Sequence, residues 1–445
     1  MKPKNMTRRR AVKLGAMTAL PLVHIRTAGA AGKLNVGLWD HWVPRGNDVM
    51  KKQIDMWAAK NQVEVQQDYI TSQGNKLLLT AAAEAQAKTG HDFIPFLQWD
   101  TIAYADDLEP VDDVIKHLSD KYGKYDPVIE YLAKSKGHWA AVPATDPTAN
   151  LTCCARISMM KQYAGIDIQE MYPARPSDPA LSTKWTYDAF LKAAEACHKA
   201  GVAFGMGLGQ TGDSVNNTGA IFSAYGADLM NAKGDITINS DNVRQVMEYG
   251  RQFVKYLPPD TVSYDDASNN RALISGKSAL IWNPPSAWAV AKRDAPKVAE
   301  DCWSFPAPAG PKGRFTPAGP WFWGIWRFSK NQTAAKELMA YLLDRPQSEA
   351  RAVASEGFDV PPFAGMLDFP IWAEVGPPKG TLYSYPPRTF HDGIPCIAGA
   401  PAPPSIGVQI YSRGIMPTML AKLQSGQSIP AVIGWAKGEL EGFVR

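Results

Sequence analysis

The chain has 445 residues, of which 45% are hydrophobic and 20% charged, with a formal net charge of +4. The first 30 residues contain seven basic side chains and no acid, so taking these seven charges from +4 leaves about −3 for the rest. The positive charge therefore gives no reason to expect a nucleic acid or an acidic membrane surface as a partner. The remaining ~415 residues exceed one typical hydrophobic core, which favours two domains.

The first 30 residues have the three parts of a targeting segment, with a basic start, a modestly apolar middle and the small-residue exit Ala28–Ala30. The run from Thr7 to Lys13 resembles a twin-arginine export motif, with Ala11 where a phenylalanine is usual. We therefore expect residues 1–30 to be a twin-arginine signal peptide and the mature protein to lie in the periplasm. An ordinary Sec leader is the alternative. No later segment is long and apolar enough to span a bilayer.

The five cysteines do not form the dense pattern of a disulfide scaffold, and no Cys or His spacing is typical of a metal site. We interpret them as small buried apolar residues, and one disulfide bond stays open as an alternative. The sequence predicts neither a metal nor a cofactor.

Strand and helix alternate at the start of the mature chain, over residues 34–39, 47–58, 63–66, 74–89 and 92–97. Asn47 or Asp48 is the expected cap of the first helix, and Gly90 is the expected end of the second. Pro95 favours an edge position or an irregular course for the third strand, because proline cannot donate a ladder hydrogen bond. The alternation predicts a doubly wound parallel sheet.

The second half of the chain carries more helical patterns. Thr186 and either Ser240 or Asp241 are expected helix caps, and Pro430 suits the first turn of the last helix. A stiff proline-rich connector is expected over 304–311, and an irregular loop region over 361–404. The other expected elements are strands at 278–282 and 321–328 and helices at 187–200, 241–254, 335–343, 416–423 and 432–443.

Four stretches, in this order, resemble the extracellular solute-binding proteins of ABC importers, in the branch typified by maltose-binding protein. The first is the strand, Trp-Asp loop and helix at the mature start. The others are GHWAAVP at 137–143, ALISGKSAL at 272–280, and PAPAG at 306–310 followed by Gly319. They are similar to the family patterns Gly-Lys-x-Tyr-Gly-x-Pro, Phe-x-x-Gly-Lys-x-Ala-Met and the return crossover. Leu273 or Ile274 stands in place of Phe, and Leu280 in place of Met.

This resemblance implies an α/β fold of periplasmic binding protein type II, with two doubly wound α/β lobes joined by crossover hinge segments. The ligand is then held between the lobes. The expected N-terminal lobe comprises 33–143 plus 309–360, and the expected C-terminal lobe 147–304 plus 363–445. The resemblance also implies the transmembrane subunits of an ABC permease as partners, and we expect a monomer.

A sugar presents a face of C–H bonds and a rim of hydroxyl groups, which suit aromatic rings and Asp, Asn or Gln side chains. Loops that combine these types are the candidate ligand-binding segments. Trp39, at the end of the first strand, is the expected core residue there, and a cap role is the alternative for Asp100. Alternation places Trp321 and Trp323 on one side of their strand and Phe322 on the other. One of these two sets is expected to be core, and Trp321 is favoured for the ligand. The candidates are Asp40, His41, Trp42, Trp99, Asp100, Asp146, Gln210, Asp213, Asn283, Trp321, Trp323 and Asp359.

The predicted function is capture of a carbohydrate or polyol and its delivery to a membrane permease, without catalysis. The chain lacks the GxSxG, HExxH and P-loop patterns of common enzyme classes. An exported carbohydrate-active enzyme, a glycoside hydrolase or lyase, is the alternative, because two carboxylates suffice for that chemistry.

Overall fold

The computed structural model describes residues 32–125, 127–144, 152–173, 176–283, 286–374 and 393–444, without the side chains of 373 and 374. The expected signal peptide and the candidate Asp146 lie outside these ranges. In the described part of the chain, no helix combines the length and the hydropathy needed to cross a membrane. All five cysteines lie in the described ranges, and all are buried and free of disulfide bonds, as their interpretation as small apolar residues predicts.

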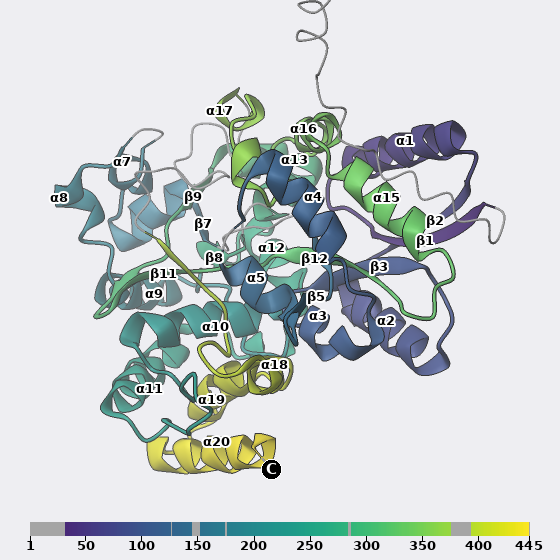
Figure 1. Ribbon diagram of the computed structural model, residues 1–445. Helices are drawn as coiled ribbons and strands as arrows, with labels where there is room; N and C mark the ends of the chain where they lie inside the picture. The colour runs from purple at the N-terminus through teal and green to yellow at the C-terminus, as the bar shows by residue number, and fades with distance from the viewer. Residues whose placement is uncertain are drawn as a thin grey trace, which may run out of the picture. The chain divides into compact units, whose positions relative to one another are not determined.

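A five-stranded sheet contains the strands expected at the mature start. Its order is β2 (Glu64–Ile70), β1 (Lys33–Trp39), β3 (Phe93–Leu97), β12 (Trp321–Ile325) and β6 (Val142–Pro143). Strand β1 runs parallel to β2 and β3, whereas β12 is antiparallel to β3 and β6. The carboxyl ends of β1 and β3 and the start of β12 therefore lie at the same end of the sheet (Figure 1). Residues at this end of the sheet line the candidate site described below.

Helices cover both faces of this sheet (Figure 1). α1 (Pro44–Asn61), α15 (Gln332–Leu342), α4 (Asp112–Tyr122) and α16 (Arg345–Ala354) lie on one side, and α2 (Lys76–Ala87) packs against β3 from the other.

Helix α1 turns Met50, Ile54 and Trp57 inward, at the spacing that the sequence predicts. It begins at Pro44 and has no side-chain cap, so the expected cap at Asn47 or Asp48 is wrong. The Asn47 side chain instead donates to Asp40 and accepts from the His41 amide.

Strand β3 is not at an edge, because it lies between β1 and β12, but its pairing is irregular, which is the alternative expectation for Pro95. Strand β3 pairs with β1 only at Val36 and Phe93, while its full length pairs with β12. The short ladder on the β1 side leaves room for a residue without an amide hydrogen.

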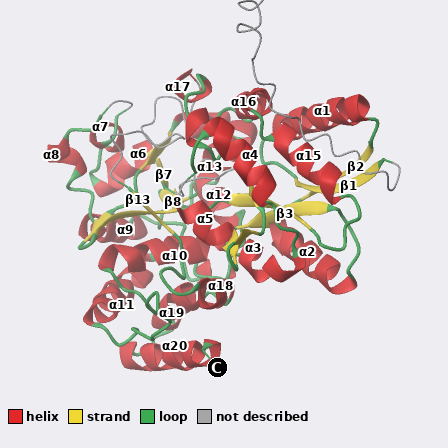
Figure 2. Ribbon diagram, in the orientation of Figure 1, coloured by secondary structure: helices red, strands yellow, loops and turns green. Residues whose placement is uncertain are grey.

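The second sheet has three short strands, and neighbouring strands in it are antiparallel. Its order is β8 (Leu280–Trp282), β7 (Cys153–Arg156) and β9 (Cys302–Phe305), with β7 antiparallel to both neighbours. The chain is mixed α/β as predicted, but this sheet is not the parallel one that a doubly wound lobe implies. Helices surround these short strands (Figure 2): α9 (Tyr187–Lys199), α10 (Gly212–Tyr225), α11 (Asp241–Phe253), α12 (Ser268–Ile274), α13 (Ser286–Asp294) and α14 (Pro296–Glu300).

Local signals place several helix starts as expected. The hydroxyl of Thr186 accepts from the Ala189 amide and that of Ser240 accepts from the Val243 amide, so both caps are confirmed. Thr211 caps α10, because its hydroxyl accepts from the Ser214 amide. Asp213 therefore lies in the first turn of a helix.

The C-terminal helices α18 (Pro404–Ser412), α19 (Ile415–Gln424) and α20 (Ile429–Phe443) lie close to one another, and α19 packs against α10 and α11. Pro430 is in the first turn of α20, as predicted. The expected connector at 304–311 is instead divided between β9 and β10. The remaining elements are β4 (Lys134–Ser135), β5 (His138–Trp139), β10 (Ala309–Gly310), β11 (Gly313–Pro317), β13 (Ile394–Cys396), α3 (Asp100–Ala103), α5 (Pro127–Ala133), α6 (Ile157–Met159), α7 (Ile168–Met171), α8 (Pro179–Ser182) and α17 (Ile371–Glu374).

Candidate functional site

A cavity of about 390 Å³ opens where the edge of the five-stranded sheet meets α10, α18 and the segments around α12 and β8. Seven of the twelve candidate residues line it: Trp42, Trp99, Asp100, Gln210, Asp213, Asn283 and Trp321. Segments far apart in the sequence thus contribute to one cavity. The residues that complete its polar and aromatic lining include Trp39, Ser72, Asn75, Gln98, Tyr104, Thr211, Asp266, Ser286, Phe358, Tyr411 and Ser412.

Aromatic rings form the wall next to the sheet. Trp39 ends β1 and Trp321 starts β12, and their ring centroids are 4.7 Å apart. Each side chain is 6% exposed, whereas Trp42 in the following loop is half-buried. Trp39, expected to be a core residue, therefore also reaches the cavity. Trp42 offers the larger open ring surface to a ligand.

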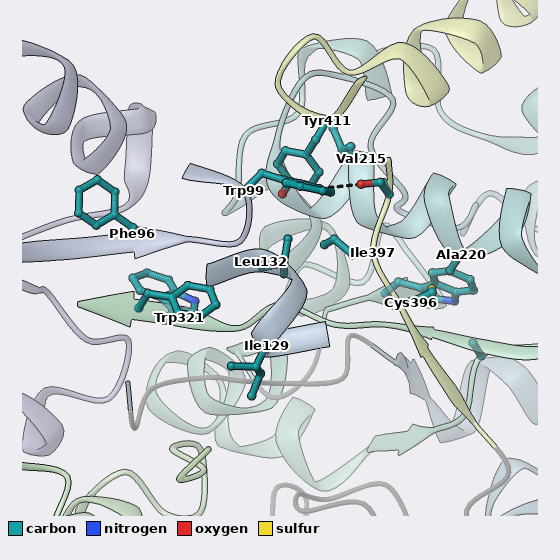
Figure 3. Close-up of a cluster of buried hydrophobic side chains, with 14 of the residues drawn as sticks. Phe96, Trp99, Ile129, Leu132, Val215, Ala220, Trp321, Cys396, Ile397 and Tyr411 are labelled. Carbon is teal, nitrogen blue, oxygen red and sulfur yellow. Dashed lines mark hydrogen bonds between the residues drawn. The ribbon is translucent and has the colours of Figure 1, made fainter. Parts of the chain in front are cut away.

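Trp99 lines the cavity from a fully buried position. Its indole nitrogen donates to the carbonyl of Ala398 at 2.8 Å (Figure 3). Tyr131 packs edge-on against its ring. The ring also lies so close to Gly407 that a Cβ there would be 2.6 Å from it. Trp99 thus joins β3 to the segment before α18 and supports the wall. Its neighbour Asp100 opens α3 without capping it, which removes the cap alternative.

Gln98 and Tyr411 form a polar contact at the cavity wall. The Tyr411 hydroxyl donates to Gln98 Oε1 at 3.0 Å and accepts from Asn216 Nδ2 at 3.4 Å. Gln98 has a φ of +42°, in the left-handed region that costs a non-glycine residue roughly 1–3 kcal/mol. Its amide donates to the carbonyl of Pro320, which holds this conformation. Such strain clusters at ligand-binding sites.

The three carboxyl groups of the cavity, Asp100, Asp213 and Asp266, are half-buried. Burial raises the pKa of Asp100 to about 7. Burial and then the charge of Asp266 raise the pKa of Asp213 to about 7, against a hydrogen bond from Asn269 at 3.0 Å. Burial and then the charge of Asp265 raise the pKa of Asp266 to about 6. Each group therefore binds a proton more readily than it does in water.

Four other candidates, Asp40, His41, Trp323 and Asp359, do not line this cavity. His41 and Asp359 are the clearest correction, because they bind each other: Nε2 of His41 lies 2.8 Å from Asp359, and both side chains are at most 5% exposed. The His41 Nδ1 accepts from the Val43 amide at 2.8 Å. This pair joins the loop after β1 to the loop after α16, so its polar atoms are used within the protein.

Trp323 is a second correction. It lies on the same side of β12 as Trp321, but two residues further into the sheet, where it is 1% exposed. Its ring packs against Phe93 and under the guanidinium of Arg351, whose carbon is 5.4 Å from the ring centroid. Trp323 is therefore part of the core.

Asp40 is exposed and borders a separate, more open hollow beside β2 and α2. There its carboxylate accepts from Asn47 at 2.8 Å. Asp146 lies outside the described residues.

Sequence reasoning missed Trp39, Gln98, Asp266 and Tyr411 as site residues. Gln98 stands beside Trp99 in a loop that the sequence had indicated, so this signal was present. Tyr411 falls on an apolar helix face and is indistinguishable there from a core residue. Among the described residues, no group of three or more His, Cys, Asp or Glu side chains is arranged to hold a metal ion.

A comparison with known protein families identifies the family of this chain. The model of the bacterial extracellular solute-binding proteins matches residues 47–349. A curated relative from Deinococcus radiodurans, described as a probable ABC transporter-binding protein, is 28% identical over 137 residues. That match covers 30% of this chain and 32% of the relative, so it spans about a third of the relative's length.

Solved structures share the fold over most of the chain. The maltose-bound MalE3 of T. maritima has a TM-score of 0.69 at 17% identity, covering 93% of this chain and 99% of its own. A solute-binding protein from Thermotoga lettingae with α-D-tagatose has a TM-score of 0.71 at 16% identity, covering 93% and 100%. One from Agrobacterium radiobacter with ribitol has a TM-score of 0.66 at 17% identity, covering 93% and 98%. At these identities the likeness establishes the fold, a two-lobed α/β binding protein.

Proposed function

Because the chain belongs to the bacterial extracellular solute-binding proteins, we propose that it captures a sugar or polyol in the periplasm and delivers it to an ABC permease. Members of this family bind solutes and are not enzymes. The role of a glycoside hydrolase or lyase therefore has no support from the family.

The lining of the cavity carries this proposal. Trp39, Trp42 and Trp321 present aromatic surface, and the faces of a sugar ring bind such surface through their C–H bonds. Asp213, Asn283 and the other polar side chains around them provide donors and acceptors for hydroxyl groups. The volume of about 390 Å³ lies near the lower end of small-molecule sites, which favours a small saccharide or polyol.

The relatives support the same ligand class. The solved structures with this fold were determined with maltose, α-D-tagatose and ribitol. We assign the ligand role here to the candidates that line the cavity and to four further residues: Trp42, Trp99, Asp100, Gln210, Asp213, Asn283 and Trp321, with Trp39, Gln98, Asp266 and Tyr411.

Delivery follows from closure of the two lobes. Closing them around a ligand replaces water with fixed hydrogen bonds and changes the shape of the protein, which a permease can recognise. We propose that residues 1–30 direct export, that the protein acts as a monomer, and that the lobes have the boundaries 33–143 plus 309–360 and 147–304 plus 363–445.

Thermal unfolding of the mature protein against a panel of sugars, polyols and amino acids tests the proposal. A ligand present at about 100 times its Kd stabilises the folded state by ~2.7 kcal/mol, which a melting curve resolves. The proposal expects such a shift with a carbohydrate or polyol. Stabilisation by an amino acid and by no carbohydrate would contradict it. So would turnover of a glycan that stops when Asp100 and Asp213 are both replaced by Asn.

A further inference from the structure

We propose that the solute carries a positive charge: it is an amino-substituted sugar or polyol whose ammonium group binds among Asp100, Asp213 and Asp266. This inference rests on the proposed function, because it concerns the same cavity and refines the class of its ligand.

The charge balance of the cavity wall is the first observation. Three carboxyl groups line the cavity, and no Lys, Arg or His is among the described residues that do so. Two arginines that lie close to lining residues in the sequence have other partners. Arg271 binds Asp265 at 2.8 Å, and Arg413 lies 3.7 Å from Glu439 and over the ring of Phe443. In the described ranges, no ion pair includes any of the three cavity carboxylates.

Other buried carboxylates of the protein are satisfied from within. Asp359 binds His41, and Glu84 binds both His91 and the indole nitrogen of Trp326. Asp92 accepts hydrogen bonds in the same way, from the Asn35 amide, Ser329 and Asn331. A charge taken out of water without a partner is strongly unfavourable. Asp213 accepts one hydrogen bond, from Asn269, but none of the three cavity carboxylates has a cationic partner among the described residues, and a cationic ligand would supply one.

The three carboxyl groups line one cavity from three different segments. Asp100 follows β3, Asp213 lies in the first turn of α10, and Asp266 precedes α12. The pKa of Tyr411, another residue of the lining, is raised by its burial and then by the charges of these three groups.

The groups that face the carboxyls are known from the same contacts. Tyr104 and Tyr411 lie beside Asp100, Asn269 and Asp266 beside Asp213, and Asp265 beside Asp266. None of them is a cation. Burial, and for Asp213 and Asp266 also a neighbouring carboxylate, favours proton binding near neutral pH in the empty protein, and an ammonium group would replace the protons.

The carboxyl groups of the cavity favour a cationic ligand over a neutral or an anionic one. An anionic sugar, such as a uronate or a sugar phosphate, would be repelled by these carboxylates. A neutral sugar would offer hydroxyl donors but no charge to balance them. An ammonium group donates three hydrogen bonds and supplies the opposite charge. The ring of Trp42 and the ring of Tyr104, both in the cavity lining, add surfaces that attract a cation.

The test compares matched ligands by isothermal titration calorimetry at neutral pH. A broad panel of sugars and polyols is used, each paired with its amino counterpart, for example sorbitol with 1-amino-1-deoxysorbitol and N-acetylglucosamine with glucosamine. In the pair that binds, the amine should bind about tenfold tighter or more, because hydrogen bonds between charged partners are about twice as strong as neutral ones. Titration in two buffers of different ionisation enthalpy should show release of protons from the carboxyl groups.

Two variants separate this charge effect from a loss of folding. Asp213→Asn keeps an acceptor for Asn269 but removes the charge, and it should lower the preference for the amine by about tenfold. The control is Asp228→Asn: Asp228 is an exposed aspartate outside the cavity lining. This control should keep the preference.

The outcomes distinguish this inference from the proposed function. Equal or tighter binding of the neutral member, or an unchanged preference in Asp213→Asn, would overturn the inference and leave a carbohydrate-binding protein. Binding of no member of the panel would contradict the proposed function as well.

Discussion

Two sets of buried carboxyl groups in this protein differ in whether the fold supplies them with a partner that can be positively charged. Asp359 is 2% exposed and lies 2.8 Å from His41, so its charge is used inside the fold. Asp100, Asp213 and Asp266 border a cavity and have no cationic partner among the described residues. Burial is costly for both sets. The presence or absence of a partner inside the protein distinguishes a carboxylate that stabilises the fold from the carboxylates that we propose bind the ligand.

The largest expected effect comes from the first set. His41→Ala leaves the buried Asp359 without its partner, and breaking such a pair lowers the free energy of unfolding by about 3–5 kcal/mol. Urea denaturation measures this loss. Asp40→Ala, the exposed neighbour, serves as control and should change stability by less than about 0.5 kcal/mol. If His41→Ala were as mild as the control, the structural role of the pair would be wrong.

The aromatic residues offer the same comparison. Trp323→Ala removes a core side chain and should lower the free energy of unfolding by about 3–5 kcal/mol. Trp42→Ala removes a half-buried ring from the cavity and should weaken ligand binding about three- to tenfold, as the loss of one aromatic contact predicts. Calorimetry with the ligand found by thermal shift, together with urea denaturation, measures both. Unchanged affinity in Trp42→Ala would remove this residue from the site.

The raised pKa values of Asp100, Asp213 and Asp266 predict that the stability of the ligand-free protein depends on pH. The pKa of Asp213 is about 7 in the folded chain and near 3.8 in the unfolded chain. Between these values the folded state holds a proton that the unfolded state has released, so the free energy of unfolding falls as the pH rises.

Asp213→Asn removes the contribution of this carboxyl group to the pH dependence of the free energy of unfolding. It should stabilise the empty protein above pH 7 by on the order of 1 kcal/mol, after allowing for screening. Thermal melts between about pH 5 and 8 measure it. Asp120→Asn, at an exposed ion pair, should leave the slope unchanged. An identical slope in Asp213→Asn would mean that this carboxyl is ionised without penalty.

The smallest expected effect tests the contact between the cavity walls. Tyr411→Phe removes the hydroxyl that joins Gln98 to Asn216 and should lower the free energy of unfolding by about 0.5–1.5 kcal/mol. Tyr163→Phe, at an exposed tyrosine, is the control. Urea denaturation compares the two variants, and equal values would mean that the Tyr411 hydroxyl contributes nothing to stability.

Local features of the fold could be predicted because their causes are local. Thr186 and Ser240 cap helices through an amide three residues away, and Pro430 suits a first turn by its own geometry. The strand and helix periods at the mature start likewise predict a sheet covered by helices. The order of four short stretches was enough to identify the family.

Where the prediction failed, a neighbour distant in the sequence was responsible. Pro95 lies in an interior strand because β12 returns from residue 321 to pair with it.

By itself, the sequence determined the class of fold, the starts of several helices and the aromatic and acidic loops from which the site is drawn. Only the tertiary structure decided which members of those loops face the cavity. His41 and Asp359, 318 residues apart, pair with each other, and Trp323 is core while Trp321 lines the cavity. Hydrogen bonds within a turn depend on adjacent residues, whereas burial and charge pairing depend on what the rest of the chain brings into contact.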